Sequence, residues 1–212
     1  MPSRPDAASP VRDRIRAEIR RQRAARPTEQ QLADDRLRDT RVLALVSELL
    51  GDQGRDAIVA CYLSRSGEPG TADLVATLAD THRVLVPKLT TYDRGRPRRE
   101  PDWTWFEGPD HLVEGVLGIP DPVGPGLGSR VLGEAKIVIA AALCAGGDGS
   151  RMGTGGGWFD RALVHRRAGV PVIALLNDDE IRTVSQEPHD QPVDWLVTPT
   201  RTIRTSVARA AD

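Results

Sequence analysis

The sequence is poor in cysteine, lysine and aromatic residues, and it has no long apolar run. Two cysteines in 212 residues, Cys61 and Cys144, are too few for a disulfide framework or a four-thiolate zinc site. Both lie in apolar runs, so we expect buried, reduced thiols. The longest apolar run covers nine residues, 137–145, whereas a membrane-spanning helix needs roughly 20. No apolar segment follows the arginine-rich N-terminus, so we expect no signal peptide and a cytoplasmic protein.

An excess of charge of either sign is also absent, because 29 basic residues stand against 30 acidic ones. This balance argues against a dedicated nucleic-acid-binding protein, which usually carries a basic excess. Only Lys88 and Lys136 are lysines, so 27 basic residues are arginines, whose planar guanidinium groups suit carboxylate or phosphate ligands. Residues 1–26 carry eight arginines and three acids, so the positive charge is concentrated at this end.

Short apolar runs that alternate with helical patterns predict an α/β fold whose mostly parallel sheet is covered on both faces. The expected strands cover 57–62, 83–87, 137–144, 171–176 and 194–198. The expected helices cover 11–25, 28–50, 71–80, 160–168 and 178–184. Thr28 and Gln31 are expected to form a capping box at the start of the second helix, and Gly51 to end it.

The proline-rich residues 1–10 are predicted to form a flexible leader, and residues 11–212 a single domain. Two segments interrupt the alternation of strands and helices. Residues 90–107 are expected to form a small hairpin or the rim of a pocket, and the glycine- and proline-rich residues 118–128 a shaped loop.

The segment Arg151–Arg161 reads Arg-Met-Gly-Thr-Gly-Gly-Gly-Trp-Phe-Asp-Arg and is the strongest functional signal. It follows an expected core strand and leads into an expected helix, which is where open α/β sheets bind ligands. Glycines there let backbone N–H groups approach a phosphate, and Arg151 and Arg161 would add positive charge. The segment is neither a Walker A motif nor a Gly-x-Gly-x-x-Gly motif. A tight turn that only reverses the chain is the alternative interpretation.

Three acidic residues near the expected strand ends are candidate ligands. Asp160 stands at an expected helix start, where it would either hold Mg²⁺ beside a polyphosphate or cap the helix. Glu68 follows the first expected strand, where a solvated loop position is the alternative. Asp190 precedes the last expected strand, and its neighbour His189 would titrate near neutrality or lie in a turn.

Four arginines of the first expected helix, Arg12, Arg16, Arg20 and Arg23, fall on one helical face. This face would bind phosphates or a ligand that carries carboxylates. A solvated face is the plainer alternative. RNA binding is a third, which we rank low because aromatic residues are not interleaved with the arginines.

Together these motifs resemble the 5-formyltetrahydrofolate cyclo-ligase family, also called 5,10-methenyltetrahydrofolate synthetases. Residues 149–161 are similar to the family signature Gly-x-Arg-Leu-Gly-x-Gly-Gly-Gly-Tyr-Tyr-Asp-Arg. Four weaker matches accompany it: Arg12-x-x-Ile15-Arg16 to Lys-x-x-Leu-Arg, Glu68-Pro69-Gly70-Thr71 to Glu-x-x-Thr, 118–122 to Gly-Ile-x-Glu-Pro, and 189–194 to His-Asp-x-x-Val-Asp. Their order and spacing cover about residues 11–200.

The resemblance implies a three-layer α/β/α, Rossmann-like fold and an enzyme that uses ATP and Mg²⁺. The reaction would convert 5-formyltetrahydrofolate to 5,10-methenyltetrahydrofolate, with ADP and phosphate as the other products, through a phosphorylated formyl group (an iminium phosphate). The implied partners are small molecules, a reduced folate and ATP, with neither nucleic acid nor membrane, and the chain would be a monomer or a weak oligomer.

The resemblance also implies the site residues. Those for ATP are Arg12, Arg14, Arg16, Arg151, Met152, Gly153, Thr154, Gly155, Gly156, Gly157, Trp158 and Phe159. Those for the folate are Arg16, Leu63, Glu68, Thr154, Gly155, Gly156, Gly157 and Trp158. Arg151 is the expected catalytic residue, and Asp160 and Asp190 are the expected magnesium ligands.

The sequence departs from the family pattern in three places. Residues 141–146 lack the aspartate that the family carries before its signature, although Asp148 lies two residues further on. Arg12 replaces a lysine, and Trp158-Phe159 replaces two tyrosines. A folate- or nucleotide-binding relative without turnover is therefore the alternative hypothesis.

Overall fold

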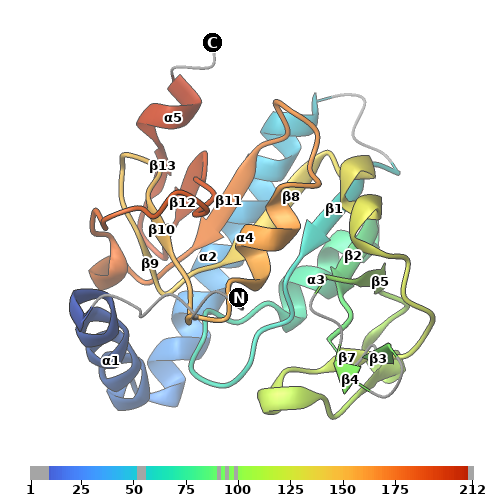
Figure 1. Cartoon of the computed structure of the whole chain (residues 1–212), viewed down its shortest axis with the longest axis horizontal. Helices are drawn as coiled ribbons and strands as arrows, with labels where there is room; N and C mark the ends of the chain where they lie inside the picture. Colours follow the sequence, from blue (N-terminus) through green and yellow to red (C-terminus); the bar gives the residue numbers. More distant parts are fainter. Residues whose placement is uncertain (1–9, 52–55, 90–91, 94–95, 98–99, 210–212) are drawn as a thin grey trace, which may run out of the picture.

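The computed structural model describes residues 10–51, 56–89, 92–93, 96–97 and 100–209, and in it a seven-stranded sheet runs through the molecule (Figure 1). The strands lie side by side in the order β13 (Thr202–Arg204), β12 (Trp195–Val197), β11 (Val172–Leu175), β8 (Ile137–Ala141), β1 (Ile58–Cys61), β2 (Arg83–Pro87) and β5 (Trp103–Trp105). The five inner strands are parallel, and both edge strands are antiparallel to their neighbours. The prediction of a mostly parallel α/β sheet is therefore confirmed.

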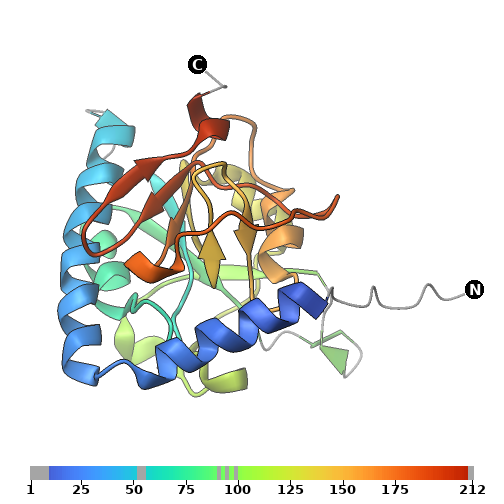
Figure 2. The ribbon, with the colours of Figure 1, turned by 90° about the vertical axis from the view of Figure 1, so that its left-hand side faces the viewer.

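Helices cover both faces of this sheet, so the molecule has three layers, with the sheet between two layers of helices (Figures 1 and 2). One face packs against α2 (Thr28–Leu50) and α3 (Ala72–Ala79), and the other against α4 (Trp158–Leu163) and the 3₁₀ helix η4 (Ser129–Glu134). Successive side chains of a strand point to opposite faces, so Val59 and Cys61 join the first core while Ala60 joins the second. This double burial explains why the strands read as unbroken apolar runs.

Both cysteines are buried and free, as expected. Burial raises the pKa of each thiol above its ordinary value, so neither is a thiolate at neutral pH.

The first helix, α1 (Pro10–Ala25), lies across the end of the molecule where the chain leaves β8 and β11 (Figure 2). It begins one residue before the predicted boundary, while residues 1–9 of the predicted leader lie outside the described residues. The bounds of α2 match the prediction, and Gly51 ends it with a φ of 56°. The predicted capping box is wrong: Pro27 is the N-cap, and the Gln31 side chain instead donates to the carbonyl of Glu68 at 3.0 Å.

The later elements are shorter than predicted, because the chain turns toward partners distant in sequence. The third core strand ends at Ala141, after which β9 (Cys144–Ala145) pairs with β10 (Arg151–Met152) in a separate antiparallel ribbon. The helix α4 ends at Leu163, its last core residue, since Val164 is 60% exposed. The predicted helix 178–184 is a single 3₁₀ turn, η5 (Asp178–Glu180), because Glu180 turns inward to an arginine.

Residues 90–107 do contain a hairpin, formed by β3 (Tyr92–Asp93) and β4 (Arg96–Pro97), but Trp103–Trp105 joins the main sheet instead. The following segment forms η2 (Pro109–His111), β6 (Leu112–Val113), η3 (Val116–Gly118) and β7 (Asp121–Pro122), with β6 and β7 paired. The last described element is α5 (Ser206–Arg209). Within the described residues, no helix has both the length and the apolar character needed to span a membrane.

Candidate active site

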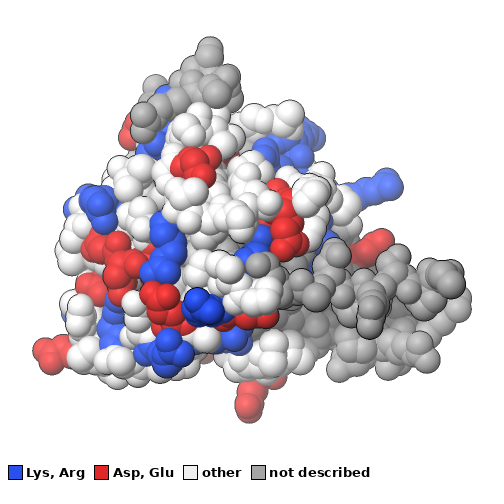
Figure 3. Space-filling model, turned by 60° about the vertical axis from the view of Figure 1, so that its left-hand side comes forward, with Lys and Arg blue, Asp and Glu red and all other residues white. Residues whose placement is uncertain are grey.

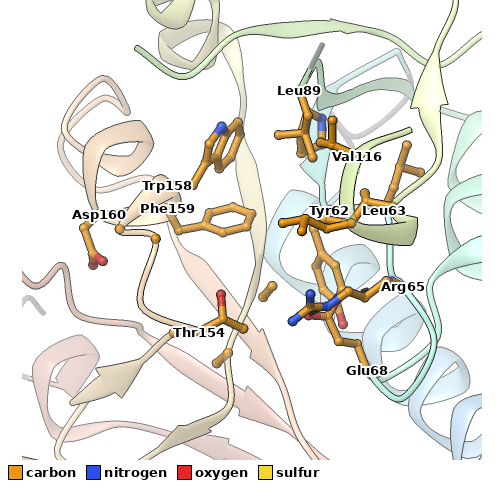
Figure 4. Close-up of a pocket in the computed structure, with 18 of the residues that line it drawn as sticks. Tyr62, Leu63, Arg65, Glu68, Leu89, Val116, Thr154, Trp158, Phe159 and Asp160 are labelled. Carbon is orange, nitrogen blue, oxygen red and sulfur yellow. Dashed lines mark hydrogen bonds and ion pairs between the residues drawn. The ribbon is translucent and has the colours of Figure 1, made fainter. Parts of the chain in front are cut away.

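A cavity of about 280 Å³ opens where β1, β2 and β8 end (Figure 4). These are the carboxyl ends of adjacent parallel strands, the edge at which α/β sheets bind ligands. The walls come from the strand ends and from four other segments: the loop after β1, the glycine-rich loop, the start of α4 and the η3 turn with Ile119. The lining residues are Tyr62, Leu63, Arg65, Glu68, Pro87, Leu89, Val116, Leu117, Ile119, Ala141, Ala142, Arg151, Gly153, Thr154, Gly156, Gly157, Trp158, Phe159 and Asp160.

The glycine-rich loop, residues 153–157, forms one wall of this cavity. Gly155 and Gly157 have φ values of 109° and 60°, a region that residues with a side chain rarely occupy, so the loop shape depends on glycine. Three of its carbonyls are held by arginines: Arg16 donates to Gly153 at 3.2 Å, Arg20 to Thr154 at 3.0 Å and Arg161 to Gly156 at 2.9 Å. Two of these donors belong to α1, so the first helix fixes the loop in place.

Arg151 supplies a buried positive charge to the cavity wall. Its side chain is 2% exposed and donates to the carboxylate of Asp160 and, at 3.4 Å, to the carbonyl of Ala141. Asp160 also accepts a hydrogen bond from the backbone of Gln191 at 3.1 Å. The capping interpretation of Asp160 is wrong, because Gly157 is the N-cap of α4 and Asp160 is its third residue.

The arginine face of α1 is turned into the protein, so the solvated-face interpretation is wrong. Arg12, Arg16 and Arg23 are buried, and only Arg20 is exposed. Each meets an acceptor distant in sequence, as in the 2.7 Å contact between Arg12 and Asp190. On the face that carries these charges, basic and acidic side chains are interspersed, not gathered into one basic surface (Figure 3).

Two carboxylates, those of Asp190 and Glu180, pair with arginines of this face. Burial is the largest single influence on the pKa of Asp190 and raises it, but the hydrogen bonds from Arg12 and from the backbone of Glu187, together with the charge of Arg12, lower the pKa below its ordinary value. Arg23 donates to both oxygens of Glu180, at 2.7 and 2.8 Å, and to the carbonyl of Ala142 at 2.9 Å. Since Ala142 lines the cavity, Arg23 ties the helix to the cavity floor.

The loop after β1 forms the opposite wall. Both oxygens of Glu68 accept hydrogen bonds from Arg65, one from its backbone and one from its side chain at 3.2 Å. The hydroxyl of Tyr62 donates to the carbonyl of Pro69 at 2.8 Å. Burial raises the pKa of Tyr62, which keeps this donor protonated. The loop therefore has a fixed shape, and Glu68 is not a solvated residue.

Aromatic rings cover the wall formed by α4. Trp158 meets Trp103 edge-on with ring centroids 5.0 Å apart, and meets Phe159 edge-on at 4.9 Å. Trp103 is fully buried, whereas Trp158 and Phe159 line the cavity (Figure 4). Flat aromatic faces of this kind suit a planar ligand ring.

The structure brings most of the expected site residues to this cavity. Those that line it are Leu63, Glu68, Arg151, Gly153, Thr154, Gly156, Gly157, Trp158, Phe159 and Asp160. Others stand behind the wall: Arg16 is bonded to the glycine loop, Met152 is fully buried, and Arg12 and Asp190 are paired with each other. Gly155 lies within the loop but not in the lining, and Arg14 is exposed on α1.

Sequence reasoning missed nine lining residues: Tyr62, Arg65, Pro87, Leu89, Val116, Leu117, Ile119, Ala141 and Ala142. Five of them stand at the carboxyl ends of β1, β2 and β8, so the rule that ligands bind beyond strand ends would have found them. The η3 residues Val116 and Leu117 gave no sequence signal, whereas Ile119 belongs to the 118–122 motif but was not assigned to the site. Their place depends on a tertiary ion pair between Lys88 and Asp121, 2.7 Å apart.

The carboxylates near the cavity differ in how well they suit a magnesium ion. Among the described residues, no group of three or more His, Cys, Asp or Glu side chains is placed to hold a metal. Mg²⁺ is usually bound through one or two carboxylates with phosphate oxygens and water completing its shell, so Asp160 at the cavity wall fits this need. Asp190 is 3% exposed and holds Arg12, so it is committed to that arginine.

The family aspartate that is missing at position 146 has no room here. A Cβ added to Gly146 would lie 2.4 Å from an oxygen of Asp148 and 2.8 Å from the Cα of Thr183. Asp148 itself accepts hydrogen bonds from the backbone and hydroxyl of Ser150 and so stabilises the turn between β9 and β10. An aspartate at position 146 would therefore require this turn to change its shape.

A mostly parallel sheet with a glycine loop, a buried arginine and aromatic rings at its carboxyl edge defines an α/β protein whose cavity suits a flat ring and an anionic group. The family model of the 5-formyltetrahydrofolate cyclo-ligase family matches residues 8–199. The chain belongs to this family, and it is a ligase. The resemblance drawn from the sequence motifs is confirmed.

Individual relatives agree with this assignment. A Mycolicibacterium smegmatis protein named 5-formyltetrahydrofolate cyclo-ligase is 35% identical over 147 residues, which cover 68% of this chain and 75% of that protein. The NMR structure of Aquifex aeolicus 5,10-methenyltetrahydrofolate synthetase shares the fold with a TM-score of 0.70 at 20% identity, over 92% of this chain and 93% of that one. The structure of a Mycoplasma pneumoniae 5,10-methenyltetrahydrofolate synthetase has a TM-score of 0.67 at 15% identity, over 89% and 98%.

Proposed function

We propose that the protein converts 5-formyltetrahydrofolate and ATP to 5,10-methenyltetrahydrofolate, ADP and phosphate, with Mg²⁺ beside the nucleotide. The observation that carries the proposal is the junction of three features in one cavity: the glycine loop, the Arg151–Asp160 pair and the Trp158–Phe159 surface. The first two suit a polyphosphate and the third a flat ring. Membership of the family supports the choice of substrate.

In this proposal the folate ring lies between the aromatic surface and the loop after β1. Trp158 and Phe159 contact one side of the ring, while Leu63 and Glu68 face it from the opposite wall. The ATP phosphates lie against the glycine loop and Arg151. Arg16 and Arg20 act indirectly, because they hold the loop carbonyls that set its shape.

The reaction needs the formyl oxygen to become a leaving group. The formyl oxygen attacks the γ-phosphorus and ADP departs, which leaves the formyl carbon as an iminium phosphate on N5. The N10 amine then attacks this carbon and loses its proton, and the C–O bond breaks as phosphate leaves. Such phosphoryl transfer asks the protein for positioning and charge stabilisation, which Arg151 provides from a site shielded from water.

Asp160 is the residue that would hold Mg²⁺ together with phosphate oxygens, since it lines the cavity next to Arg151. When bound, the ion would neutralise charge on those oxygens. Asp190 keeps Arg12 in place, and the Arg12 charge in turn acts on Asp160. We therefore propose Asp160 as the direct ligand and Asp190 as a residue that positions Arg12.

The test is ATP- and Mg²⁺-dependent growth of the near-ultraviolet absorbance of the methenyl product when protein and 5-formyltetrahydrofolate are mixed. Substituting Arg151→Gln should lower kcat by at least about 100-fold, because a charge aligned with the transferring phosphoryl group is lost. Arg167→Gln is the matched control, since Arg167 is exposed and lies outside the cavity lining.

Each part of the proposal can be refuted separately. Absence of product with saturating ATP and Mg²⁺ would refute the reaction. Equal turnover of the Arg151→Gln and Arg167→Gln variants would refute the role of Arg151. Binding of the folate without any turnover would instead support the non-catalytic alternative.

A further inference from the structure

A second cavity, of about 390 Å³, lies beside the first and is lined by three arginines, Arg20, Arg23 and Arg65. The two cavities share three lining residues, Arg65, Glu68 and Leu117, so they adjoin. The second cavity is formed between α1, the loop after β1 and the end of η3. Of its lining residues, Glu68 and Gly118 belong to the family motifs, whereas Arg20, Arg23 and Arg65 do not.

Two of the three arginines that line the second cavity, Arg20 and Arg65, have guanidinium groups that could bind a ligand. Glu68 is the carboxylate of its lining, and both of its oxygens accept hydrogen bonds from Arg65. That contact uses the backbone and Nε of Arg65, so the two terminal nitrogens of the guanidinium are left for another acceptor. Arg20 is exposed and uses Nη2 for the carbonyl of Thr154. Arg23, in contrast, is committed to Glu180.

The charged groups define two separate places where an anion could bind. In Figure 4 Asp160, the partner of Arg151, lies on one side of the first cavity, and Arg65 and Glu68 lie on the other. A phosphate chain held by Arg151 and the glycine loop therefore lies away from Arg65. The second group of arginines suits a different anion, one that belongs to the other end of a bound ligand.

We propose that Arg20 and Arg65 bind the carboxylates of the glutamyl tail of the folate substrate. This inference rests on the proposed function, in which the substrate ring occupies the first cavity. A reduced folate carries its glutamate beyond a flat aminobenzoyl ring, so a molecule bound by its pterin in the first cavity must send two carboxylates outward. Guanidinium groups bind carboxylates through charge-assisted, often bidentate hydrogen bonds.

Leu117 lies at the junction of the two cavities, where the aminobenzoyl part of the bound folate would pass. It lines both cavities and is 78% exposed, although a leucine side chain prefers burial. Its φ of 57° is in the left-handed region, which is costly for a leucine and persists only where the surrounding chain fixes it. An apolar side chain held at this junction would cover the aminobenzoyl ring between the two cavities.

The experiment compares the binding of two ligands that differ only in the tail: 5-formyltetrahydrofolate and its glutamate-free analogue, 5-formyltetrahydropteroate. Binding is followed by quenching of protein tryptophan fluorescence, which needs no turnover. The wild-type protein should bind the glutamate-bearing ligand about ten-fold more tightly. The Arg20→Gln and Arg65→Gln variants should each lose several-fold of this preference, and the double variant nearly all of it. The preference should also shrink as salt is raised.

Arg21→Gln is the matched control, because Arg21 is an exposed arginine of α1 that lines neither cavity. It should keep the wild-type preference. Where turnover is measurable, the KM for ATP should be unchanged in the Arg65→Gln and Arg21→Gln variants, since neither residue holds the glycine loop.

Equal affinity of the wild-type protein for the two ligands would overturn the proposal. So would an equal loss for both ligands in the variants, or a rise in the KM for ATP in the Arg65→Gln variant, which would assign the second cavity to phosphate. Turnover without tail preference would leave the proposed function intact, whereas tail preference without turnover would refute the reaction but not the tail site. Binding of neither ligand would refute both.

Discussion

At the scale of single residues, Asp39 of α2 is held in surroundings that oppose its charge. Its side chain is partly buried, and Oδ1 has no hydrogen-bond partner among the described residues. Burial, helped by the nearby charge of Asp35, raises the pKa of Asp39 to about 7. The carboxyl is therefore protonated in the folded protein at pH values where the unfolded chain has already lost its proton.

The raised pKa of Asp39 fixes the sign of a pH effect on stability. The unfolded chain releases this proton near pH 4 and the folded protein near pH 7, so Asp39 lowers the free energy of unfolding as pH rises across that interval. Asp39→Asn should therefore raise the melting temperature by roughly 2–6 °C at pH 8. At pH 4 the substitution should have little effect.

Thermal unfolding of the wild type and the variant across this pH range checks the prediction. Glu48→Gln, an exposed carboxylate of the same helix, is the control and should show no pH-dependent difference. A constant effect of Asp39→Asn from pH 4 to pH 8 would contradict the raised pKa.

At the scale of elements, α1 is joined to the segment around η5 by one buried and one exposed ion pair. In the buried pair, Arg23 and Glu180 are 6% and 1% exposed. In the exposed pair, Arg182 and Glu18 are 30% and 39% exposed, with the charged atoms 3.0 Å apart. Loss of one partner from a buried pair leaves an uncompensated charge, whereas an exposed charge is solvated by water.

The two pairs therefore predict different costs for the same substitution. Glu180→Ala should lower the free energy of unfolding by about 3 kcal/mol, because Arg23 loses its carboxylate while it stays buried. Glu18→Ala should change the melting temperature by less than about 1 °C. Chemical denaturation of both variants measures the difference. Similar losses for the two would mean that the burial of Arg23 carries no energetic weight.

The same elements show what could be predicted from the sequence and why. The inner strands were found because strands buried on both faces read as apolar runs, as in Ile137–Ala141. The edge strands β5 and β13 were missed, since each has three residues and its pairing depends on a neighbour supplied by the fold. The ends of α4 and η5 were misplaced because tertiary contacts of Asp160 and Glu180 overrode the local signals.

For the site, the glycine loop could be predicted because its conformation requires glycine, and local sequence records that requirement. The inward direction of the α1 arginines could not be chosen from the sequence. A helical arginine stripe looks the same whether it faces water or carboxylates, and the carboxylates lie about 160 residues away or more. Residues 118–122 were matched as a motif, but the place of η3 in the cavity wall could not be predicted for the same reason, since the Lys88–Asp121 pair places it.

At the scale of the whole molecule, the proposed substrates would contact parts of the chain that are far apart in sequence. The first cavity draws its walls from residues between Tyr62 and Asp160, and α1 closes over the glycine loop from the N-terminal end. Ligands that bind only this folded arrangement shift the unfolding equilibrium toward the native state.

We therefore expect 5-formyltetrahydrofolate with a non-hydrolysable ATP analogue, each at about 100 times its Kd, to stabilise the protein. One such ligand contributes about 2.7 kcal/mol, which corresponds to roughly 5–10 °C in melting temperature for a chain of this size. Differential scanning fluorimetry measures the shift. The Arg151→Gln variant should show a smaller shift with the nucleotide analogue, and an equal one would contradict the placement of the phosphates.

The large sequence separation between the α1 arginines and their partners has a consequence for folding during protein synthesis. Arg12 pairs with a residue 178 positions later, and Arg23 with one 157 positions later. At roughly 5–20 residues per second, the ribosome delivers the Arg12 partner roughly 10 to 35 s after the helix itself. Until then Arg12 and Arg23 lack the carboxylates that they pair with in the folded protein, and these two side chains remain hydrated. The helix made first is thus among the last to dock, and a chain released before residue 180 cannot complete the wall that holds the glycine loop.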